Sequence, residues 1–278
     1  MIDFTKSIAE NKRIKGAPLL AAHRGVNGAN VPPNTLTAYK IATDMGAEIV
    51  EIDVSISKDG EYFVFHPGME GRYIGQGIKL GELTASEIDE LNLRNTDGVK
   101  TSYKIPRLSE VLALLKGKAY INVDKFWTDI PGISRAIREA GVEDQVIVKT
   151  YTDKESLELV KEHASDFMFI PMVRGKDEVT DGLLADGVNV VGTEILFSSE
   201  DDEVISAEYI AKMHGRGLLI WINSIVYNEG DVISAYHTDD SAFKISPEHG
   251  WGWLIDHGAD IIQTDWLMPL AAYISKRS

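Results

Sequence analysis

Short apolar runs alternate with amphipathic helical stretches along the whole chain, and this alternation constrains the fold more than any other feature. The runs have the length and the aliphatic content of buried strands, whereas the stretches between them repeat apolar residues at helical spacing. A strand followed by a helix and another strand is typical of parallel sheets with right-handed crossovers. The predicted strands are 19–22, 47–56, 61–66, 119–123, 145–150, 167–172, 188–191, 218–222 and 260–263. The predicted helices are 35–45, 84–91, 130–140, 154–163, 177–185, 207–214 and 252–257.

This pattern predicts an α/β fold. Eight of these strands, each followed by a helix or an excursion, within 278 residues favour a closed TIM (β/α)8 barrel over an open doubly wound sheet. No Gly-x-Gly-x-x-Gly motif follows the first strand, which argues against a dinucleotide-binding fold. We interpret the chain, 1–278, as a single barrel domain.

Residues 67–105 interrupt the alternation after the second barrel strand. This glycine-containing segment with one expected helix, 84–91, is predicted to be a small insertion at the barrel mouth. Enzymes with this fold act at the carboxyl ends of the strands, so an insertion there can shape substrate access. A surface loop without function is the alternative interpretation.

Composition narrows the partners and the metals. The chain has 28 basic and 43 acidic residues, a formal net charge of -15, and no cysteine. Such a surface repels nucleic-acid phosphates and anionic lipids, so we expect neither nucleic acid nor stable membrane insertion, and we leave the oligomeric state open. Without thiolates, the strong ligands are oxygen and imidazole, which favours Mg²⁺, Ca²⁺ or Mn²⁺ over structural zinc.

The amino-terminal residues lack the apolar core of a signal peptide, and no run reaches the ~18 apolar residues of a transmembrane helix. We therefore expect a cytoplasmic protein. Prior removal of a signal peptide would leave a periplasmic or secreted location open.

Paired carboxylates on one strand provide the first functional signal. Glu51 and Asp53 stand two residues apart, so they project from one face of the strand 47–56. Two carboxylates on the inward face of a barrel are unfavourable unless a cation neutralises them, and together they can bind one hard divalent ion. Asp124, at the end of the next barrel strand, is the candidate third ligand, with helix capping as its alternative role.

Two histidines end neighbouring apolar strands. His23 follows the run 19–22, His66 closes the run 61–66, and each is followed closely by a turn-forming residue. Their placement at one rim beside the carboxylates indicates an acid–base pair around a cation.

These residues belong to a longer series of motifs. In order, the chain carries His23-Arg24-Gly25, Asn34-Thr35, Gly46-Ala47-Glu48, Glu51-Ile52-Asp53-Val54, Lys58-Asp59-Gly60, His66, Ile105-Pro106-Arg107-Leu108-Ser109-Glu110-Val111-Leu112, Trp221-Ile222-Asn223 and Gly258-Ala259-Asp260-Ile261-Ile262-Gln263-Thr264-Asp265. The series resembles the glycerophosphodiester phosphodiesterase family over nearly the whole chain, most specifically in its first third.

The resemblance implies a TIM barrel that hydrolyses glycerophosphodiesters to sn-glycerol 3-phosphate and an alcohol. It also implies one divalent cation, Mg²⁺ or Ca²⁺, and an imidazole acid and base. By residue, it assigns the metal to Glu51, Asp53 and Asp124, the acid–base pair to His23 and His66, and a phosphate oxygen to Arg24.

Three positions depart from the family pattern. Pro33 stands where the family has Glu, Pro67 stands where it usually has Asp, and Phe126 occupies the position of a phosphate-binding Lys. Lys125 is expected to point to the opposite face unless a bulge redirects it. We therefore expect Lys149, on the strand 145–150, to supply the missing cation.

Trp221 is the candidate for a further substrate contact. Together with Trp251, Trp253 and Trp266, it could line a choline or apolar pocket, with core packing as the alternative.

Two other functions stay open. An Asp as third ligand is similar to the sphingomyelinase D-type phospholipid phosphodiesterases, and the three departures are compatible with a catalytically silent barrel that binds phosphodiesters or sugar phosphates.

Overall fold

The computed structural model describes residues 2–75, 77–226 and 230–277. Eight parallel strands close into a barrel, which confirms the predicted fold class. Closure is made by β1, which pairs with β2 through Ala21 and Ile49 and with β9 through Ala22 and Thr264. The barrel strands are β1 (Leu19–Ala22), β2 (Ile49–Ile56), β4 (Tyr120–Asp124), β5 (Val146–Thr150), β6 (Met168–Arg174), β7 (Gly192–Leu196), β8 (Leu219–Asn223) and β9 (Ile261–Thr264).

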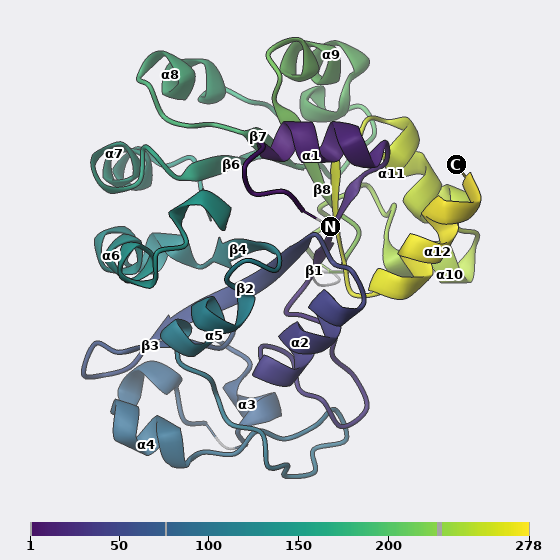
Figure 1. Ribbon diagram of the computed structural model, residues 1–278. Helices are drawn as coiled ribbons and strands as arrows, with labels where there is room; N and C mark the ends of the chain where they lie inside the picture. Colours follow the sequence, from purple (N-terminus) through teal and green to yellow (C-terminus); the bar gives the residue numbers. More distant parts are fainter. Residues whose placement is uncertain (1, 76, 227–229, 278) are drawn as a thin grey trace.

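Helices surround the strands on the outside of the barrel (Figure 1). Their apolar faces pack on the outward aliphatic residues of the strands in one large cluster. These helices are α2 (Leu36–Asp44), α5 (Leu108–Leu115), α6 (Ile130–Ala140), α7 (Lys154–His163), α8 (Thr180–Ala185), α9 (Ala207–Gly215), α10 (Asp239–Lys244), α11 (Trp253–Asp256) and α12 (Leu267–Arg277). Short 3-10 turns occupy Leu80–Glu82, Phe126–Thr128, Glu143–Gln145 and Glu203–Ile205, and a π-helical turn spans Glu248–Gly252. No helix in the described part of the chain is long and apolar enough to cross a membrane.

The helix α1 (Ile8–Lys15) lies across the amino end of the barrel (Figure 1). It begins at a capping box in which Ser7 and Glu10 satisfy each other's backbone N–H groups, and it ends at Gly16 in the left-handed conformation. Ile8 joins the inward residues of the strands in a second apolar cluster, which fills this end of the barrel. The amino end is therefore packed shut, and the carboxyl end is the open one.

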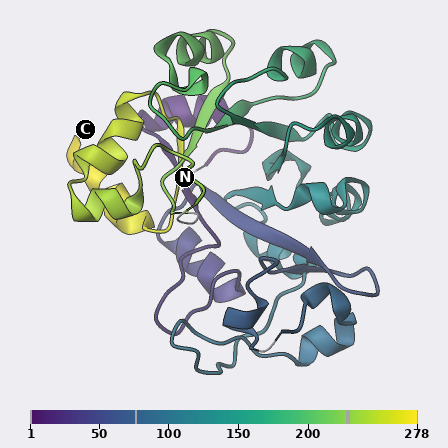
Figure 2. The same cartoon turned by 180° about the vertical axis from the view of Figure 1, so that it is seen from behind.

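The segment after β2 forms a separate layer at one side of the barrel (Figure 2). The short strand β3 (Tyr62–Val64) returns antiparallel to β2, and α3 (Glu70–Tyr73) and α4 (Ala85–Glu90) follow. These elements bury their own apolar cluster, which includes Phe65, Leu80 and Ile88.

One predicted strand is wrong in position. Residues 188–191 make only an isolated bridge, and the sixth barrel strand is β7, Gly192–Leu196. Val188 and Val190 are buried in the outer apolar cluster, which explains their strand-like pattern. Gly192 begins the strand where a Cβ would lie 2.4 Å from the carbonyl oxygen of Leu219, so only glycine allows β7 to approach β8 this closely.

Candidate active site

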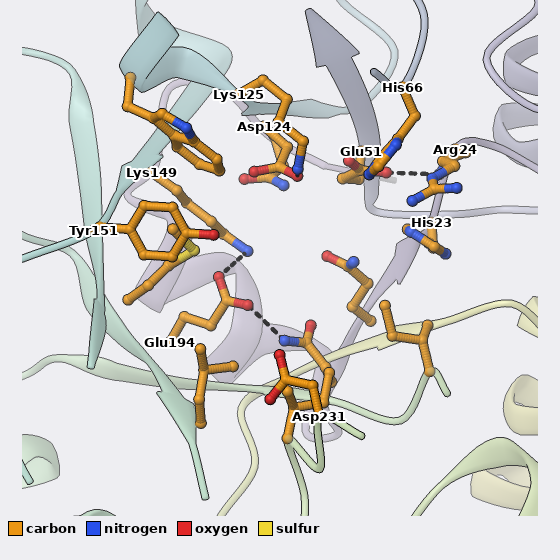
Figure 3. Close-up of a pocket in the computed structure, with 18 of the residues that line it drawn as sticks. His23, Arg24, Glu51, His66, Asp124, Lys125, Lys149, Tyr151, Glu194 and Asp231 are labelled. Carbon is orange, nitrogen blue, oxygen red and sulfur yellow. Dashed lines mark hydrogen bonds and ion pairs between the residues drawn. The ribbon is translucent and has the colours of Figure 1, made fainter. Parts of the chain in front are cut away.

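A pocket opens at the carboxyl ends of the strands, and most of the residues that line it are polar or charged (Figure 3). Side chains from β2, β4, β5, β6, β7, β8 and β9 line it together with residues from the loops that follow the barrel strands. The lining residues used below are His23, Arg24, Glu51, His66, Asn122, Asp124, Lys125, Lys149, Glu194, Asn223 and Gln263. The fold thus brings residues more than two hundred positions apart in sequence to one rim, as parallel barrels do.

Glu51, Asp53 and Asp124 form one acidic cluster, in which an oxygen from each residue lies within 4.8 Å of the others. Strand register explains the arrangement, because Asp53 pairs with Asp124 across β2 and β4. Glu51 and Asp53 are buried, whereas Asp124 is half-buried at the strand end. The three predicted metal-binding residues therefore lie together, and carboxylate oxygens are the ligands that Mg²⁺ and Ca²⁺ prefer.

The pKa values of the two inner carboxyls, Glu51 and Asp53, shift in opposite directions. Burial, and next to it the charge of Asp53, raises the pKa of Glu51 to about 8. Burial acts on Asp53 in the same direction, but neighbouring cations, with Arg24 the strongest, hold the pKa of Asp53 below its usual value. One oxygen of Asp53, Oδ1, is buried without a hydrogen-bond partner among the described residues. This free buried oxygen matches a site built to receive a cation.

The turn after β1 positions Arg24 over the cluster. Arg24 adopts a left-handed φ of 57°, and Gly25 follows at 75°, where a Cβ would lie 2.7 Å from the backbone of Ala38. The Arg24 backbone N–H donates to Glu51 Oε2 at 2.7 Å, and the guanidinium Nε lies 3.1 Å from Asp53 Oδ2. The His-Arg-Gly motif thus fixes a cation beside both inner carboxylates.

Asn34 orients Asp53 from the other side. Its Nδ2 donates to Asp53 Oδ2 at 2.8 Å, while its own Oδ1 accepts a hydrogen bond from Tyr39 at 2.6 Å. Asn34 is buried and left-handed, with a φ of 58°. The resemblance included this residue without giving it a function, so its contact with Asp53 is new information from the structure.

His23 is held by Asp265, which directly follows β9. His23 Nδ1 lies 2.8 Å from Asp265 Oδ1. Burial alone would lower the pKa of His23, but Asp265 outweighs burial and raises it above its usual value. Asp265 is itself fixed by the buried Asp239, whose Oδ2 accepts the Asp265 backbone N–H at 2.9 Å. Neither aspartate was predicted as a site residue, although the position of Asp265 immediately after a strand is the signal that could have identified it.

His66 lies opposite His23 across Arg24 (Figure 3). Its Nε2 is 4.0 Å from Asp53 Oδ1, and both ring nitrogens are buried without a hydrogen-bond partner in the described part of the chain. Burial lowers the pKa of His66 and keeps the ring neutral near pH 7. The surroundings of the two histidines therefore shift their pKa values in opposite directions, upward for His23 and downward for His66.

Lys125 does not point away from the site, which corrects the sequence-based expectation. A left-handed backbone, with φ 61° and ψ 18°, redirects its side chain at the end of β4. Its Nζ lies 2.8 Å from Asp124 Oδ2 and 3.9 Å from Asp53 Oδ1, and it lines the pocket. Phe126, at the family's lysine position, is instead buried in the outer core.

Lys149 reaches the pocket wall from β5 but is already paired. Its buried Nζ lies 2.7 Å from Glu194 Oε2 and 3.2 Å from the centre of the Trp221 ring. Burial lowers the pKa of Lys149, and Glu194 opposes this shift. Glu194 also accepts a hydrogen bond from Asn223, so these residues form one buried network (Figure 3). Glu194 was missed because its strand was placed too early.

Trp221 is not at the pocket surface, contrary to expectation. It is fully buried in the second apolar cluster, at the amino end of the barrel, and its indole N–H donates to Asn223 Oδ1 at 3.1 Å. Its contribution to the site is the support of Lys149. Of the other tryptophans, Trp251 donates to Asp239, Trp253 stacks on His237, and Trp266 is half exposed beside the site.

The fold and the polar rim place this chain among the TIM-barrel proteins whose functional groups lie at the carboxyl ends of the strands. The chain belongs to the glycerophosphoryl diester phosphodiesterase family, whose pattern matches residues 23–221. A domain of unknown function matches residues 169–274 as well.

Curated relatives carry the same family name. A glycerophosphodiester phosphodiesterase from Caldanaerobacter subterraneus is 35% identical over 142 residues, which cover 48% of this chain and 58% of the relative. One from Bacillus subtilis is 25% identical over 236 residues, covering 77% and 78% of the two chains. The chain spans little more than half the length of the Caldanaerobacter and Bacillus altitudinis relatives that it matches, at 58% and 56%.

Solved structures share the fold over almost the full length. A glycerophosphoryl diester phosphodiesterase from Parabacteroides distasonis superposes with a TM-score of 0.76 at 25% identity, covering 94% of this chain and 87% of that one. An Oleispira antarctica phosphodiesterase, solved in complex with the product sn-glycerol-3-phosphate, gives 0.65 at 16% identity, covering 94% and 98%.

Proposed function

We propose that this protein hydrolyses glycerophosphodiesters to sn-glycerol 3-phosphate and an alcohol, with one divalent cation and a pair of histidines. The acidic cluster with His23 and His66 at the same rim is the observation that carries the proposal. Membership of the family and the sn-glycerol-3-phosphate bound to the Oleispira antarctica neighbour support it.

The acidic cluster fits a hard divalent ion. Asp53 Oδ1 is buried without a hydrogen bond, and Glu51 has a pKa of about 8 because it is buried next to another carboxylate. Glu51, Asp53 and Asp124 would hold Mg²⁺ or Ca²⁺, which when bound supplies polarisation of the phosphodiester and neutralises charge on the departing oxygen.

The remaining side chains have separable tasks. Arg24 binds a non-bridging phosphate oxygen with its guanidinium. His66, which is neutral, accepts the proton of the attacking hydroxyl, from water or from the substrate itself. His23, whose protonated form Asp265 stabilises, donates its proton to the alcohol oxygen as the bond between phosphorus and that oxygen breaks. The hydrogen bond that His23 Nδ1 donates to Asp265 distinguishes the acid from the base, because His66 has no such partner among the described residues.

Release of glycerol 3-phosphate from glycerophosphocholine, glycerophosphoethanolamine and glycerophosphoglycerol tests the proposal. We expect release that stops in EDTA and returns when excess Mg²⁺ or Ca²⁺ is added. Release that EDTA leaves intact would overturn the metal assignment alone. Phosphodiester binding in calorimetry without turnover of any of the three, in either metal, would instead identify a silent binding barrel. Cleavage of sphingomyelin in their place would favour the sphingomyelinase D-type alternative.

A further inference from the structure

A second hollow adjoins the active-site pocket, and we call it the lateral groove. The pocket and the groove share His23, Arg24, His66 and Ile225. Beyond these four residues the walls of the groove come from the loops after β1, β8 and β9, the end of α2, the insertion and the start of α12. The two hollows therefore meet where the phosphorus atom would be attacked.

The groove is more apolar than the pocket. Its wall includes Met45, Met69, Val226, Trp266 and Met268. Four of these five are among the twelve large apolar side chains that the described part of the chain exposes, at 44% to 52%. Exposed apolar residues scattered singly are ordinary on a protein surface, whereas a contiguous group beside a reactive centre marks a binding surface.

Contacts within the wall hold its aromatic residue in place. Trp266 packs edge-on against Phe243, with ring centroids 4.9 Å apart, and its backbone N–H donates to Thr264. Met69 enters from the insertion, on the short turn that directly follows His66. The residues expected to shape substrate access thus supply one side of an apolar wall.

The charges of the groove disfavour a cationic ligand. Among the described residues that line the groove, Asp265 alone carries a carboxylate, and that carboxylate already accepts a hydrogen bond from His23. Arg72, on the insertion side, places its guanidinium over the Tyr73 ring at 5.3 Å. A quaternary ammonium group would meet Arg72 without a free carboxylate to oppose it.

The pocket, in contrast, suits a polyol. Asn122 Oδ1 and Gln263 Oε1 are buried there without hydrogen-bond partners in the described part of the chain, and Asn223 and Glu194 stand beside them. Such unpaired acceptors are unfavourable unless a ligand hydroxyl donates to them.

A phosphodiester carries one alcohol group on each side of its phosphorus atom, and we call these groups its two arms. The pocket and the groove differ in polarity, so each suits a different arm. We propose that the pocket binds the glycerol arm and that the lateral groove binds the alcohol arm, which is an alkyl chain. The groove, which is open to solvent, has about 1770 Å³ of space against about 670 Å³ for the equally open pocket, so it has room for the longer arm. This inference rests on the proposed function and names its substrate class as glycerophosphodiesters of apolar alcohols.

A series of synthetic diesters tests the inference. Glycerol phosphodiesters of methanol, butanol, octanol and glycerol are assayed for glycerol 3-phosphate release, at concentrations below micelle formation. We expect kcat/KM to rise about a hundredfold from methyl to octyl, because each methylene that enters an apolar wall adds to binding. The glycerol diester is expected to resemble the methyl one.

Substitutions in the wall locate the effect. Met268→Ser and Trp266→Ala are expected to reduce the octyl-to-methyl ratio at least tenfold. The matched control is Ile14→Ser, which removes an exposed apolar side chain from α1 at the opposite end of the barrel and is expected to leave the ratio at its original value. Thermal melting of each variant verifies that the barrel is folded.

Three results contradict the inference. Equal rates across the alkyl series would leave the hydrolase intact and the groove without this role. A rising series that persists in both wall variants would place the alkyl arm elsewhere. Absence of glycerol 3-phosphate from every diester would overturn the proposed function and the inference together.

Discussion

The two ends of the barrel are built from the same strands and differ in nearly every physical property. On β2 the inward residue Ile49 is followed two positions later by Glu51, and on β5 Ile147 is followed by Lys149. The same step from apolar to polar occurs at Tyr120 and Asn122, at Trp221 and Asn223, and at Ile261 and Gln263. The strand period of two keeps both members of each pair inside the barrel.

The amino end of the barrel serves mainly stability, whereas the carboxyl end carries the groups for chemistry. At the amino end the inward layer is apolar and sealed by α1, so it gains burial free energy without polar groups to satisfy. At the carboxyl end several buried polar atoms have no hydrogen bond, among them Asp53 Oδ1 and Asn122 Oδ1. Those atoms lower the stability of the ligand-free protein and prepare it for a bound ion and substrate.

Neutralising one carboxylate of the acidic cluster at the polar end is expected to have the largest effect on activity. Asp53→Asn is expected to reduce kcat/KM about ten-thousandfold, equivalent to about 5.5 kcal/mol of transition-state stabilisation, while the barrel remains folded. Glycerol 3-phosphate release and circular dichroism measure the two effects. Asp44→Asn, an exposed carboxylate paired with Lys40 on α2, is the control and should keep full activity. An active Asp53→Asn enzyme would be incompatible with the metal assignment.

A second substitution asks whether the buried network of the polar end serves stability or phosphate binding. Lys149→Met leaves Glu194 as an unpaired buried charge and is expected to lower the free energy of unfolding by about 3–5 kcal/mol in urea denaturation. The double variant Lys149→Met/Glu194→Gln should recover most of that loss. The measured kcat/KM then tests whether Lys149 binds phosphate. If the double variant regains stability and also full kcat/KM, Lys149 does not bind phosphate, and Lys125 is the cation that remains.

A third substitution sharpens the assignment of acid and base. Asp265→Asn removes the carboxylate that raises the pKa of His23, so His23 should lose its proton at a lower pH than in the native protein. Because the proposed acid must be protonated, the alkaline limb of the pH–rate profile should move to lower pH, with kcat about a hundredfold smaller near pH 8. The acidic limb, assigned to His66, should stay in place. A profile that keeps both limbs would remove Asp265 from this role.

The smallest expected effect lies at the apolar end. Tyr120→Phe deletes the hydroxyl that accepts a hydrogen bond from Asn11 at 2.9 Å and keeps the ring against Phe4. We expect a loss of about 1 kcal/mol in the free energy of unfolding and no change in kcat/KM. A change in activity without a change in stability would show that the two ends are coupled, contrary to the separation drawn above.

Local sequence patterns were sufficient to predict the barrel and to bring the acidic cluster and both histidines to one rim. Alternation along β2 gave Glu51 and Asp53 one face, and the ends of apolar runs gave His23 and His66. The catalytic roles of these residues are predictions that the activity measurements test, and the interpretation of 67–105 as an insertion within one domain is a further prediction.

Three features were beyond such patterns, each for a physical reason. Lys125 depends on a left-handed backbone, which no residue preference at that position announces. Glu194 depends on the start of β7, which the neighbouring valines obscured because they are buried outside the sheet. Asp265 depends on a contact with His23 across 242 positions, and long-range pairing is invisible in a window of neighbours.

That last contact has a consequence for folding. His23 and Asp265 meet only when β1 pairs with β9, the step that joins the first strand of the barrel to the last. Pairing of such distant segments is slow, because the entropy of closing a long loop must be overcome before the contact is gained. A chain that has formed seven strands and not yet closed has its metal ligands in place but not its oriented acid. Catalytic competence would thus be acquired at ring closure, and the appearance of activity during refolding would time the completion of the barrel itself.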